Sequence, residues 1–328
     1  MKKIAVFGAS GDVGRYFIDY LLAKGEEYDI LAIGRRKQLS IWNGYENVTY
    51  LSVDIRNKTD FEKLPDDIFA VVDFAGIMPA RMKGYHPQQY IDVNITGTLN
   101  ILEYARYAHA DRILFMQSFG DIKDYGETEV LLTAHMPRKF SFNTDHTVYV
   151  MTKNFAVDLL ENYHQMYGLK NFVFRLPTIY LYSKTDSFYV NGIKRQMGYR
   201  KLIDMARNGE VMEVWGNPFR VKDMIYVKDF CQMLSLALRV NRTSGYYNVG
   251  TGVGISLLNQ IKGIVQVFGH NNEIKFCPEK PNAPQYIMDI TPARLELGYE
   301  PYYDYISGLR DFKAEMDSNR LYKEDEIE

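Results

Sequence analysis

A glycine-rich turn near the N-terminus constrains the fold more than any other feature of this sequence. It reads Gly8-Ala9-Ser10-Gly11-Asp12-Val13-Gly14. Residues 4–8 form the apolar run of a buried strand, and residues 14–24 have the apolar spacing of a helix. Glycines at such a junction allow a tight turn and a close approach of the backbone to a ligand. Since a helix N-terminus also offers unpaired N–H groups, this unit predicts dinucleotide binding on an α/β fold.

The first half of the chain continues this alternation of strand and helix. We expect long helices at residues 90–108 and 148–167, and strands at residues 4–8, 29–33, 48–53, 69–75, 113–117 and 171–176. Such alternation gives a parallel sheet covered on both faces. After residue 177 the rhythm loosens, although residues 224–227 and 246–249 read as strands on either side of a helix at 229–240.

The fold class we expect is a Rossmann-type doubly wound parallel sheet with a smaller C-terminal α/β substrate domain. The dinucleotide-binding domain comprises residues 1–177 together with about 223–250. Residues 178–222 and 251–321 form the substrate-binding domain. Residues 322–328 are rich in charge and are expected to be a disordered tail.

Composition excludes several classes of partner. The 328 residues carry a net charge of −2, so no global basic field favours nucleic acid or an anionic membrane. No apolar stretch approaches the length of a membrane span. The two cysteines, Cys231 and Cys277, form no CxxC pair, so neither a disulfide framework nor a metal site is expected. A reducing cytoplasm fits this usage best.

The position that commonly holds an acid for the adenosine ribose carries cations here. The sequence just after the second expected strand reads Gly34-Arg35-Arg36-Lys37. Arginine binds phosphate through a rigid fork of donors, so these residues favour the 2′-phosphate of NADP over NAD. A solvated basic turn is the alternative interpretation.

Tyr149 and Lys153 are four residues apart at the start of the long helix expected after the fifth strand. At that spacing they share one helix face. An unperturbed tyrosine is a poor base at neutral pH, but a neighbouring ammonium group stabilises the phenolate. The pair therefore predicts proton transfer beside a bound dinucleotide, as in a redox enzyme.

Together with these two motifs, further segments between residue 3 and about 315 resemble the extended short-chain dehydrogenases/reductases, in particular their nucleotide-sugar epimerase/dehydratase group. The segments are Asp54-Ile55, Phe74-Ala75-Gly76, Asn94-Ile95-Thr96-Gly97-Thr98-Leu99-Asn100-Ile101-Leu102-Glu103, Phe115-Met116-Gln117-Ser118, Arg175-Leu176-Pro177-Thr178, Asp223-Met224-Ile225-Tyr226-Val227-Lys228-Asp229, Tyr247-Asn248-Val249-Gly250-Thr251-Gly252 and Leu297-Gly298-Tyr299-Glu300-Pro301.

The resemblance implies a role for each matching position. Tyr149 would deprotonate a sugar hydroxyl, most often at C4, Lys153 would bind the nicotinamide ribose and lower the pKa of Tyr149, and Ser118 would hydrogen-bond the reacting oxygen. The implied NAD(P) contacts are Gly8, Ser10, Gly11, Asp12, Val13, Gly14, Arg35, Arg36, Asp54, Ile55, Phe74, Ala75, Gly76, Asn94, Tyr149, Lys153, Leu176 and Pro177. The implied substrate contacts are Met78, Ser118, Thr178, Arg220, Lys222 and Lys280.

Several positions depart from the family pattern. Lys222 and Lys280 stand where arginines commonly hold the substrate diphosphate, and Thr178 replaces a common asparagine. Lysine attracts phosphate without the bidentate geometry of arginine. An anionic substrate is therefore still expected, while a standard UDP-hexose is not assured. The residues after Ser118 lack the Thr-Asp-Glu run of the 4,6-dehydratases, which counts against dehydration.

The function expected from this resemblance is a nucleotide-sugar 4-epimerase, with an NADPH-dependent 4-ketoreductase as the main alternative. A reductase of a non-nucleotide carbonyl compound and a non-catalytic NADP-binding sensor are further alternatives. The family commonly dimerises through two long helices, here around residues 94–108 and 149–165, so a homodimer is expected. The nucleotide, the sugar and the pathway stay open.

Overall fold

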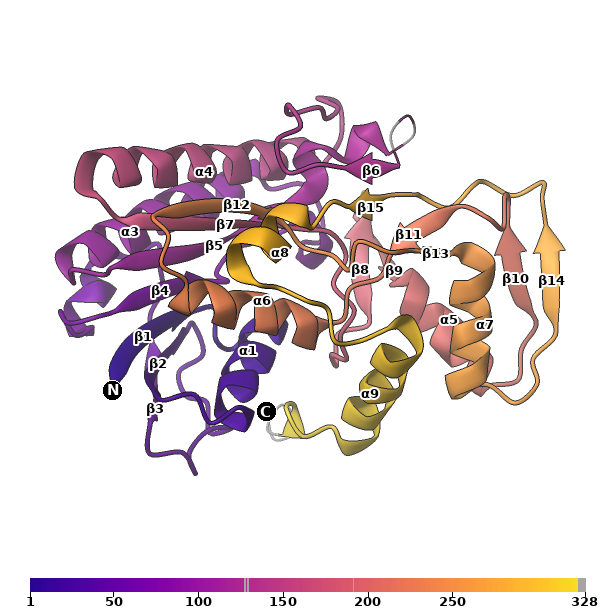
Figure 1. The fold of residues 1–328 in the computed structure, drawn as a ribbon, viewed down its shortest axis with the longest axis horizontal. Coiled ribbons are helices and arrows are strands. Elements are labelled where there is room, and N and C mark those ends of the chain that lie inside the picture. Colours follow the sequence, from indigo (N-terminus) through magenta and orange to yellow (C-terminus); the bar gives the residue numbers. More distant parts are fainter. Residues whose placement is uncertain (127, 129, 191, 324–328) are drawn as a thin grey trace.

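A seven-stranded parallel sheet forms one half of the molecule (Figure 1). The computed structural model describes residues 1–323 except 127, 129 and 191. The strand order is β12-β7-β5-β4-β1-β2-β3. The strands are β1 (Lys2–Phe7), β2 (Tyr28–Gly34), β3 (Val48–Ser52), β4 (Ala70–Asp73), β5 (Arg112–Ser118), β7 (Lys170–Leu176) and β12 (Ser244–Asn248). The chain reverses direction of winding between β1 and β4, which is where doubly wound sheets bind ligands. The expected fold class is confirmed.

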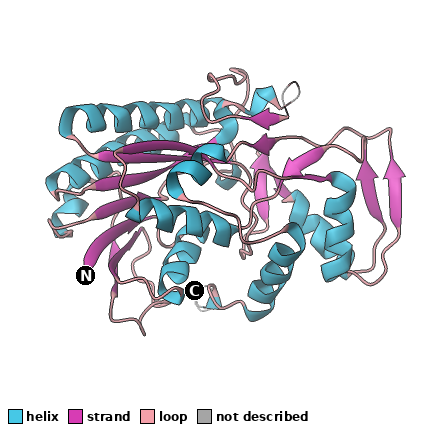
Figure 2. Ribbon diagram, in the orientation of Figure 1, coloured by secondary structure: helices cyan, strands magenta, loops and turns pink. Residues whose placement is uncertain are grey.

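Helices cover both faces of this sheet (Figure 2). One face carries α1 (Asp12–Ala23) and α6 (Val227–Arg239), and the other carries α3 (Thr98–Tyr107) and α4 (Thr147–Tyr167). Side chains of a strand point alternately to its two faces. In β1, Ile4 and Val6 accordingly join the apolar cluster under α1 and α6, while Ala5 and Phe7 join the cluster under α3 and α4.

The helix expected at residues 90–108 is interrupted. It consists of α2 (Pro87–Tyr90), a π-helical stretch (Ile91–Gly97) and α3. The π-helical stretch contains Asn94 and ends at Gly97, where a Cβ atom would lie 2.5 Å from Ile55 Cδ1. Wide turns of this kind are frequent at functional sites. Here the stretch brings the helix backbone directly against Ile55, one of the residues expected to contact NAD(P).

A second group of elements lies beyond the sheet, at the right of Figure 1. It contains a hairpin of β8 (Ser187–Val190) and β9 (Ile193–Gln196), then α5 (Gly198–Arg207), β10 (Met212–Trp215), β11 (Val221–Asp223), β13 (Gly254–Ser256), α7 (Leu257–Phe268) and β14 (Ile274–Cys277). β10 pairs with β14 in parallel, and β11 pairs with β13 antiparallel. Two-residue strands β6 (Leu131–Leu132) and β15 (Ile287–Met288) pair with each other.

The prediction of a strand at residues 224–227 is wrong. The strand is β11, which ends at Asp223, and α6 begins at Val227. Between them Tyr226 makes only an isolated bridge to Tyr180. The apolar run is buried, but a short buried run alone does not distinguish a strand from the approach to a helix.

The C-terminal elements return to the sheet. α8 (Thr291–Leu297) packs against α6 and β12, although the sequence analysis placed residues 251–321 in the substrate domain, and α9 (Tyr305–Ser318) packs against α7. The tail was expected to begin at residue 322, whereas Tyr322 is 3% exposed and its hydroxyl donates to Asp12 at 3.0 Å. The rest of the expected tail, residues 324–328, lies outside the described residues.

Candidate active site

A cleft opens at the carboxyl ends of β1, β2 and β4, where the glycine turn meets the turn after β4. It is lined by Gly8, Ser10, Gly11, Ile33, Gly34, Arg35, Val53, Asp54, Ile55, Phe74, Ala75, Gly76, Ile77 and Val93. Nine of these residues are among the predicted cofactor contacts. The sequence analysis missed Ile33, Gly34, Val53, Ile77 and Val93, which are strand ends or neighbours of predicted residues.

Gly8 explains how closely the two walls of the cleft approach each other. Its φ angle is +77°, and a Cβ atom there would lie 2.8 Å from both Phe74 C and Ala75 N. A side chain would therefore push the turn after β4 away. The N-terminus of α1 follows this turn, and its unpaired N–H groups with the helix dipole suit a pyrophosphate.

The end of the cleft away from the N-terminus of α1 carries one cationic and one anionic side chain, Arg35 and Asp54. Arg35 lines the cleft and is exposed, while Asp54 is held by Arg56 through an ion pair of 2.5 Å. The Arg56 side chain lowers the pKa of Asp54. Arg36 does not line the cleft, and its carbonyl accepts a hydrogen bond from Tyr50. The glycine turn, the apolar strand ends and the cation at Arg35 together fit a dinucleotide.

Ser118 and Tyr149 come together at the same edge of the sheet. Ser118 ends β5, and its Oγ accepts a hydrogen bond from Gly120 N at 3.1 Å. Tyr149 lies in the first turn of α4, partly buried. Burial raises the pKa of Tyr149, and a side-chain hydrogen bond with Ser118 lowers it. The contact with Gly120 N uses only a lone pair of Ser118 Oγ, so the Ser118 hydroxyl can donate its proton to the Tyr149 oxygen.

Lys153 lies one turn further along α4 and is buried against the sheet. Its side chain is close to the cleft wall, since a Cβ atom on Gly76 would lie 3.7 Å from Lys153 Nζ. Nζ lies 4.3 Å from the centre of the Phe115 ring. Burial lowers the pKa of Lys153 to about 8, and the negative charge of Asp73 opposes this shift.

Asp73 is the group at this site that the sequence analysis missed. It ends β4, is 1% exposed, and accepts a hydrogen bond from Ala75 N at 2.9 Å through Oδ1. Its Oδ2 has no hydrogen-bond partner among the described residues. Burial raises the pKa of Asp73 to about 6, and Lys153 opposes the shift. A carboxyl group directly before Phe74-Ala75-Gly76 was the available signal.

The resemblance implied that Lys153 lowers the pKa of Tyr149. In the structure burial dominates, and the pKa of Tyr149 is raised. The charge of Lys153 is balanced by Asp73 and reduced by its own burial, which limits its effect on the phenol.

Asn94 holds α4 against the cleft wall. Its Oδ1 accepts from Ile77 N at 2.9 Å, and its Nδ2 donates to Ile77 O at 3.0 Å and to Thr152 Oγ1 at 3.2 Å. Asn94, a predicted cofactor contact, thus links Ile77 in the cleft wall to Thr152, the residue before Lys153. It does not line the cleft itself.

Behind Ser118 a buried ion pair fixes the strand ends. Arg175 donates to Asp121 at 2.9 Å and to Ala134 O at 2.9 Å. Desolvation raises the pKa of Asp121, while Arg175 opposes it. The next residue, Leu176, pairs with Ser118 in the ladder of β5 and β7. The predicted Leu176 and Pro177 therefore lie beside the catalytic edge rather than in the cleft.

A second pocket lies at the substrate end. It is lined by Tyr180, Tyr199, Leu202, Arg220, Lys222, Met224, Gln260, Ile264, Ala283, Pro284 and Tyr305. Lys222 Nζ lies 5.8 Å and 5.6 Å from the ring centres of Tyr180 and Tyr286. Burial lowers its pKa to about 8, and it makes no ion pair with a carboxylate among the described residues. Arg220 Nε donates to Ala283 O at 2.5 Å. Cations and aromatic rings in one pocket suit an anionic ligand with a planar group.

Three predicted substrate contacts lie elsewhere. Lys280 is exposed, with Nζ 5.5 Å from the centre of the Trp215 ring, and does not line this pocket. Met78 is 44% exposed beyond the cleft, and Thr178 is exposed. Two predicted cofactor contacts that follow Asp12, namely Val13 and Gly14, lie inside α1 and do not line the cofactor cleft either.

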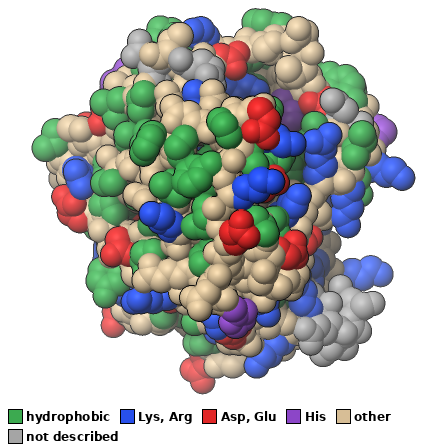
Figure 3. Space-filling view, turned by 90° about the vertical axis from the view of Figure 1, so that its right-hand side faces the viewer, with side chains coloured by type: hydrophobic (Ala, Val, Ile, Leu, Met, Phe, Trp, Pro, Cys, Tyr) green, Lys and Arg blue, Asp and Glu red, His purple; other side chains and the backbone are tan. Residues whose placement is uncertain are grey.

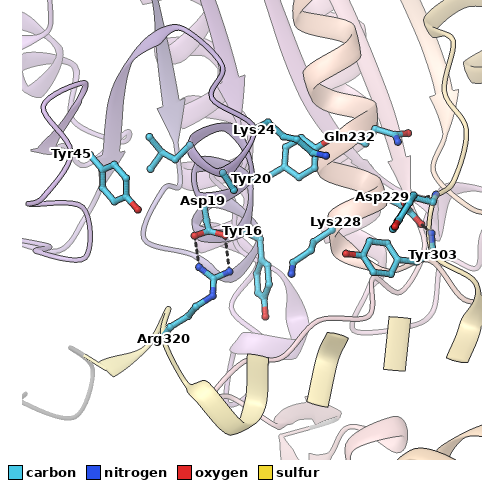
Figure 4. Close-up of a pocket in the computed structure, with 13 residues that line it drawn as sticks. Tyr16, Asp19, Tyr20, Lys24, Tyr45, Lys228, Asp229, Gln232, Tyr303 and Arg320 are labelled. Atoms are coloured by element: carbon cyan, nitrogen blue, oxygen red, sulfur yellow. Dashed lines mark hydrogen bonds and ion pairs between the residues drawn. The ribbon is translucent and has the colours of Figure 1, made fainter. Parts of the chain in front are cut away.

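A larger cavity of about 600 Å³ lies on the other side of the molecule, between α1, α6 and the C-terminal segment (Figure 4). Most of its charged groups already have partners in the protein. Arg320 binds Asp19 and Glu315, and Asp229 accepts the N–H groups of Tyr302 and Tyr303. This cavity therefore separates packed helices, and the predicted catalytic residues do not line it.

The described residues contain no cluster of His, Cys, Asp and Glu able to hold a metal ion. In the same part of the chain, no helix has the length and apolar character needed to cross a membrane. On the face at the substrate end, Lys and Arg side chains lie among acidic and apolar ones (Figure 3).

Comparison with known proteins gives consistent results. The model of the "NAD dependent epimerase/dehydratase family" matches residues 4–250. The low-salt glycan biosynthesis protein Agl12 of Haloferax volcanii is 28% identical over 93% of this chain and 96% of its own length. A UDP-glucose 4-epimerase of Pisum sativum is 24% identical over 94% of each chain.

Solved structures show the same fold at low identity. The UDP-glucose 4-epimerase of Thermotoga maritima with UDP-glucose has a TM-score of 0.76 and 20% identity, covering 96% of this chain and 100% of the other. The UDP-glucuronic acid 4-epimerase of Bacillus cereus in complex with NAD has a TM-score of 0.73 and 22% identity, covering 98% and 100%.

Proposed function

The chain belongs to the NAD-dependent epimerase/dehydratase family of extended short-chain dehydrogenases/reductases, and we propose that it is a nucleotide-sugar 4-epimerase. One observation carries the proposal. Ser118 and Tyr149 are hydrogen-bonded at the edge of the sheet, and Lys153, one turn along the same helix, lies beside Gly76 of a cleft that fits a dinucleotide. This arrangement supports a role for Tyr149 as an acid–base group beside a bound hydride carrier.

The proposed roles follow from the geometry. Tyr149 takes the proton of the C4 hydroxyl while Ser118 donates a hydrogen bond to the same oxygen. Lys153, whose ammonium group lies over the Phe115 ring, hydrogen-bonds the nicotinamide ribose. A nicotinamide bound in the cleft would supply hydride acceptance and return. In its oxidised form it also carries a positive charge, which would help lower the pKa of Tyr149 where Lys153 alone does not.

The substrate end supports an anionic sugar donor. Lys222 and Arg220 line one pocket with several tyrosines, and Lys222 lacks a carboxylate partner among the described residues. The diphosphate of a nucleotide sugar would supply the missing negative charge. The relatives named UDP-glucose 4-epimerase support this class of substrate without fixing the nucleotide or the sugar.

A 4-ketoreductase is the second candidate, and Arg35 favours it. Arg35 lines the cleft where an acid would suit NAD, so it favours the 2′-phosphate of NADP, which reductases commonly consume. The solved neighbours include complexes with NAD.

We also propose a homodimer formed by α3 and α4 with the segment before α3. Apolar side chains remain exposed along these helices, namely Ile91, Leu99, Tyr107, Met151, Phe155, Met166 and Tyr167. A row of this kind on two neighbouring helices suits burial against a second copy. Phe155→Glu is expected to give a monomer in light-scattering measurements, whereas Lys123→Glu, away from these helices, would not.

The decisive experiment supplies UDP-, GDP-, CDP- and dTDP-sugars, each with NAD(H) or NADP(H). An epimerase interconverts C4 isomers with catalytic cofactor. A ketoreductase consumes NADPH in stoichiometric amounts with a 4-keto sugar. If no sugar nucleotide turns over and Tyr149→Phe leaves the biological activity unchanged, a non-catalytic sensor becomes the better interpretation.

A further inference from the structure

Asp12 lies at the junction of four distant segments. It is the first residue of α1, within the glycine turn. Its Oδ2 accepts from Arg81 Nη2 at 2.7 Å, and its Oδ1 accepts from Ser183 Oγ at 2.9 Å and from the Tyr322 hydroxyl at 3.0 Å. One carboxylate therefore joins the glycine turn to the loop after β4, to the chain leaving β7 and to the C-terminal segment.

A carboxylate is an unusual neighbour for a pyrophosphate. An acid in the first turn stabilises a helix, but the same helix end is where the negative charge of a dinucleotide is expected. Arg81 compensates the charge of Asp12. An isolated surface ion pair contributes little, but this carboxylate is partly sheltered and receives three donors.

The Asp12–Arg81 pair joins the two walls of the cofactor cleft. One wall is the glycine turn at Gly8, Ser10 and Gly11, and the other is the turn at residues 74–77. Arg81 ends the short 3₁₀ turn Pro79–Arg81 that continues the second wall, and β8 packs against this turn. Widening the cleft beside Gly11 therefore requires this ion pair to open.

The C-terminal segment fixes the Asp12 side of the pair. Arg15 donates to Leu321 O at 2.5 Å and to Ser10 O at 3.1 Å, and its guanidinium lies 4.9 Å from the centre of the Tyr322 ring. The segment that follows α9, up to Tyr322, accordingly lies beside α1 (Figure 1). Asp12 is anchored, so the movable partner is Arg81, for which the described residues offer no second acceptor.

We propose that Asp12 and Arg81 form a clasp across the cofactor cleft, and that this clasp governs how fast the dinucleotide enters and leaves. The inference rests on the proposed function, because it assigns the cleft to NAD(P). It also deepens that function: a closed clasp keeps the cofactor resident between turnovers. An epimerase needs a resident cofactor, whereas a ketoreductase must exchange its cofactor in every cycle.

The test measures cofactor exchange directly, without any sugar. NADH or NADPH, whichever binds, is mixed with the protein in a stopped-flow instrument, and its fluorescence gives the association rate. A chase with excess oxidised cofactor gives the dissociation rate. In Arg81→Met both rates are expected to rise about tenfold, with the dissociation constant changing much less, because one charge-assisted contact no longer has to open.

Two further variants keep the test independent of one substitution. Tyr322→Phe and Ser183→Ala each remove one donor to Asp12, and each is expected to raise both rates about two- to threefold. Arg106→Met is the matched control, because it breaks an exposed pair with Glu103 on α3 and should change neither rate. Thermal unfolding of each variant confirms that it is folded.

Two results would overturn the clasp. Unchanged rates in Arg81→Met would show that the pair has no part in exchange. A faster dissociation with an unchanged or slower association would show that Arg81 acts as a counter-ion for the pyrophosphate and not as a barrier. Either result leaves the sugar assay untouched, and failure of the sugar assay leaves the exchange rates measurable, so the two proposals fail separately.

Discussion

The catalytic edge and the substrate pocket treat their buried cations in opposite ways. At the catalytic edge, Lys153 is balanced by Asp73 within the protein. In the substrate pocket, Lys222 has aromatic neighbours and no carboxylate partner among the described residues. Both pKa values are lowered to about 8, but only Lys222 gains a partner by binding an anion. We therefore expect Lys153, whose charge Asp73 compensates, to position the reacting groups, and Lys222, whose charge is not compensated, to bind an anionic ligand.

The largest expected effect concerns the catalytic edge. Tyr149→Phe should lower kcat about 1,000-fold, because it removes the group that moves the proton while leaving its ring in place. Cofactor binding, followed by fluorescence titration, should stay within twofold of the parent. Tyr90→Phe is the matched control, since its ring lies 6.3 Å from that of Tyr149. An active Tyr149→Phe variant would remove the contrast between the two regions.

The next effect concerns the unpaired cation. Lys222→Met should raise KM for the nucleotide sugar about 30-fold at pH 7 with a smaller change in kcat, because a charge-assisted contact to an anion is lost. Arg239→Met, which removes an exposed cation on α6, serves as the control. A lower kcat with an unchanged KM in Lys222→Met would instead indicate that Lys222 acts in the chemical step.

Lys222 also predicts a pH dependence. Its pKa is lowered to about 8, so its charge is present below pH 8 and is lost as the pH rises through this value. The kcat/KM of the parent should therefore fall between pH 7 and 9 by a step that Lys222→Arg lacks, since arginine stays protonated. The same step in both proteins would assign the titration to another group, such as Lys153.

A smaller effect is expected for cofactor choice. Arg35→Ser should weaken NADPH about tenfold and NADH hardly at all, because a surface arginine contributes modestly to a phosphate contact. Arg56→Ser tests the specificity of this effect, since Arg56 is engaged by Asp54. Equal loss for both cofactors would contradict an assignment of Arg35 to the 2′-phosphate.

The smallest effect should come from the compensated pair. Asp73 raises the pKa of Lys153, so Asp73→Asn should lower that pKa further and leave Lys153 deprotonated at lower pH than in the parent. The expected result is a loss of kcat/KM of about threefold at pH 8 with little change at pH 6. A uniform loss at every pH would instead indicate a structural role for Asp73.

The sequence predicts the catalytic edge better than the substrate pocket for a physical reason. The glycine turn, Ser118 and the Tyr149–Lys153 spacing depend on local backbone geometry, which short motifs encode. The contacts of Asp12 with Arg81 and Tyr322, and the electrostatic influence of Asp73 on Lys153, depend on segments that meet only in the folded chain. No periodicity carries that information.

The misplaced elements have the same origin. Residues 224–227 are as apolar as a strand, but β11 pairs one step earlier with β13. The helix expected at residues 90–108 keeps its apolar spacing and yet widens over Ile91–Gly97, where Gly97 meets Ile55. Tyr322 was assigned to a charged tail, but its ring is buried beneath Arg15. Tertiary contacts decided each case.

The stacking of Lys280 on Trp215 gives the protein an internal optical probe. The chain has two tryptophans, and Trp42 is 4% exposed whereas Trp215 is 43% exposed. A soluble collisional quencher will therefore reach the indole at the substrate end and spare the one in the core. Because Trp215 ends β10, next to the loop that contributes Ala283 and Pro284 to the substrate pocket, its emission can follow ligand binding without an added label.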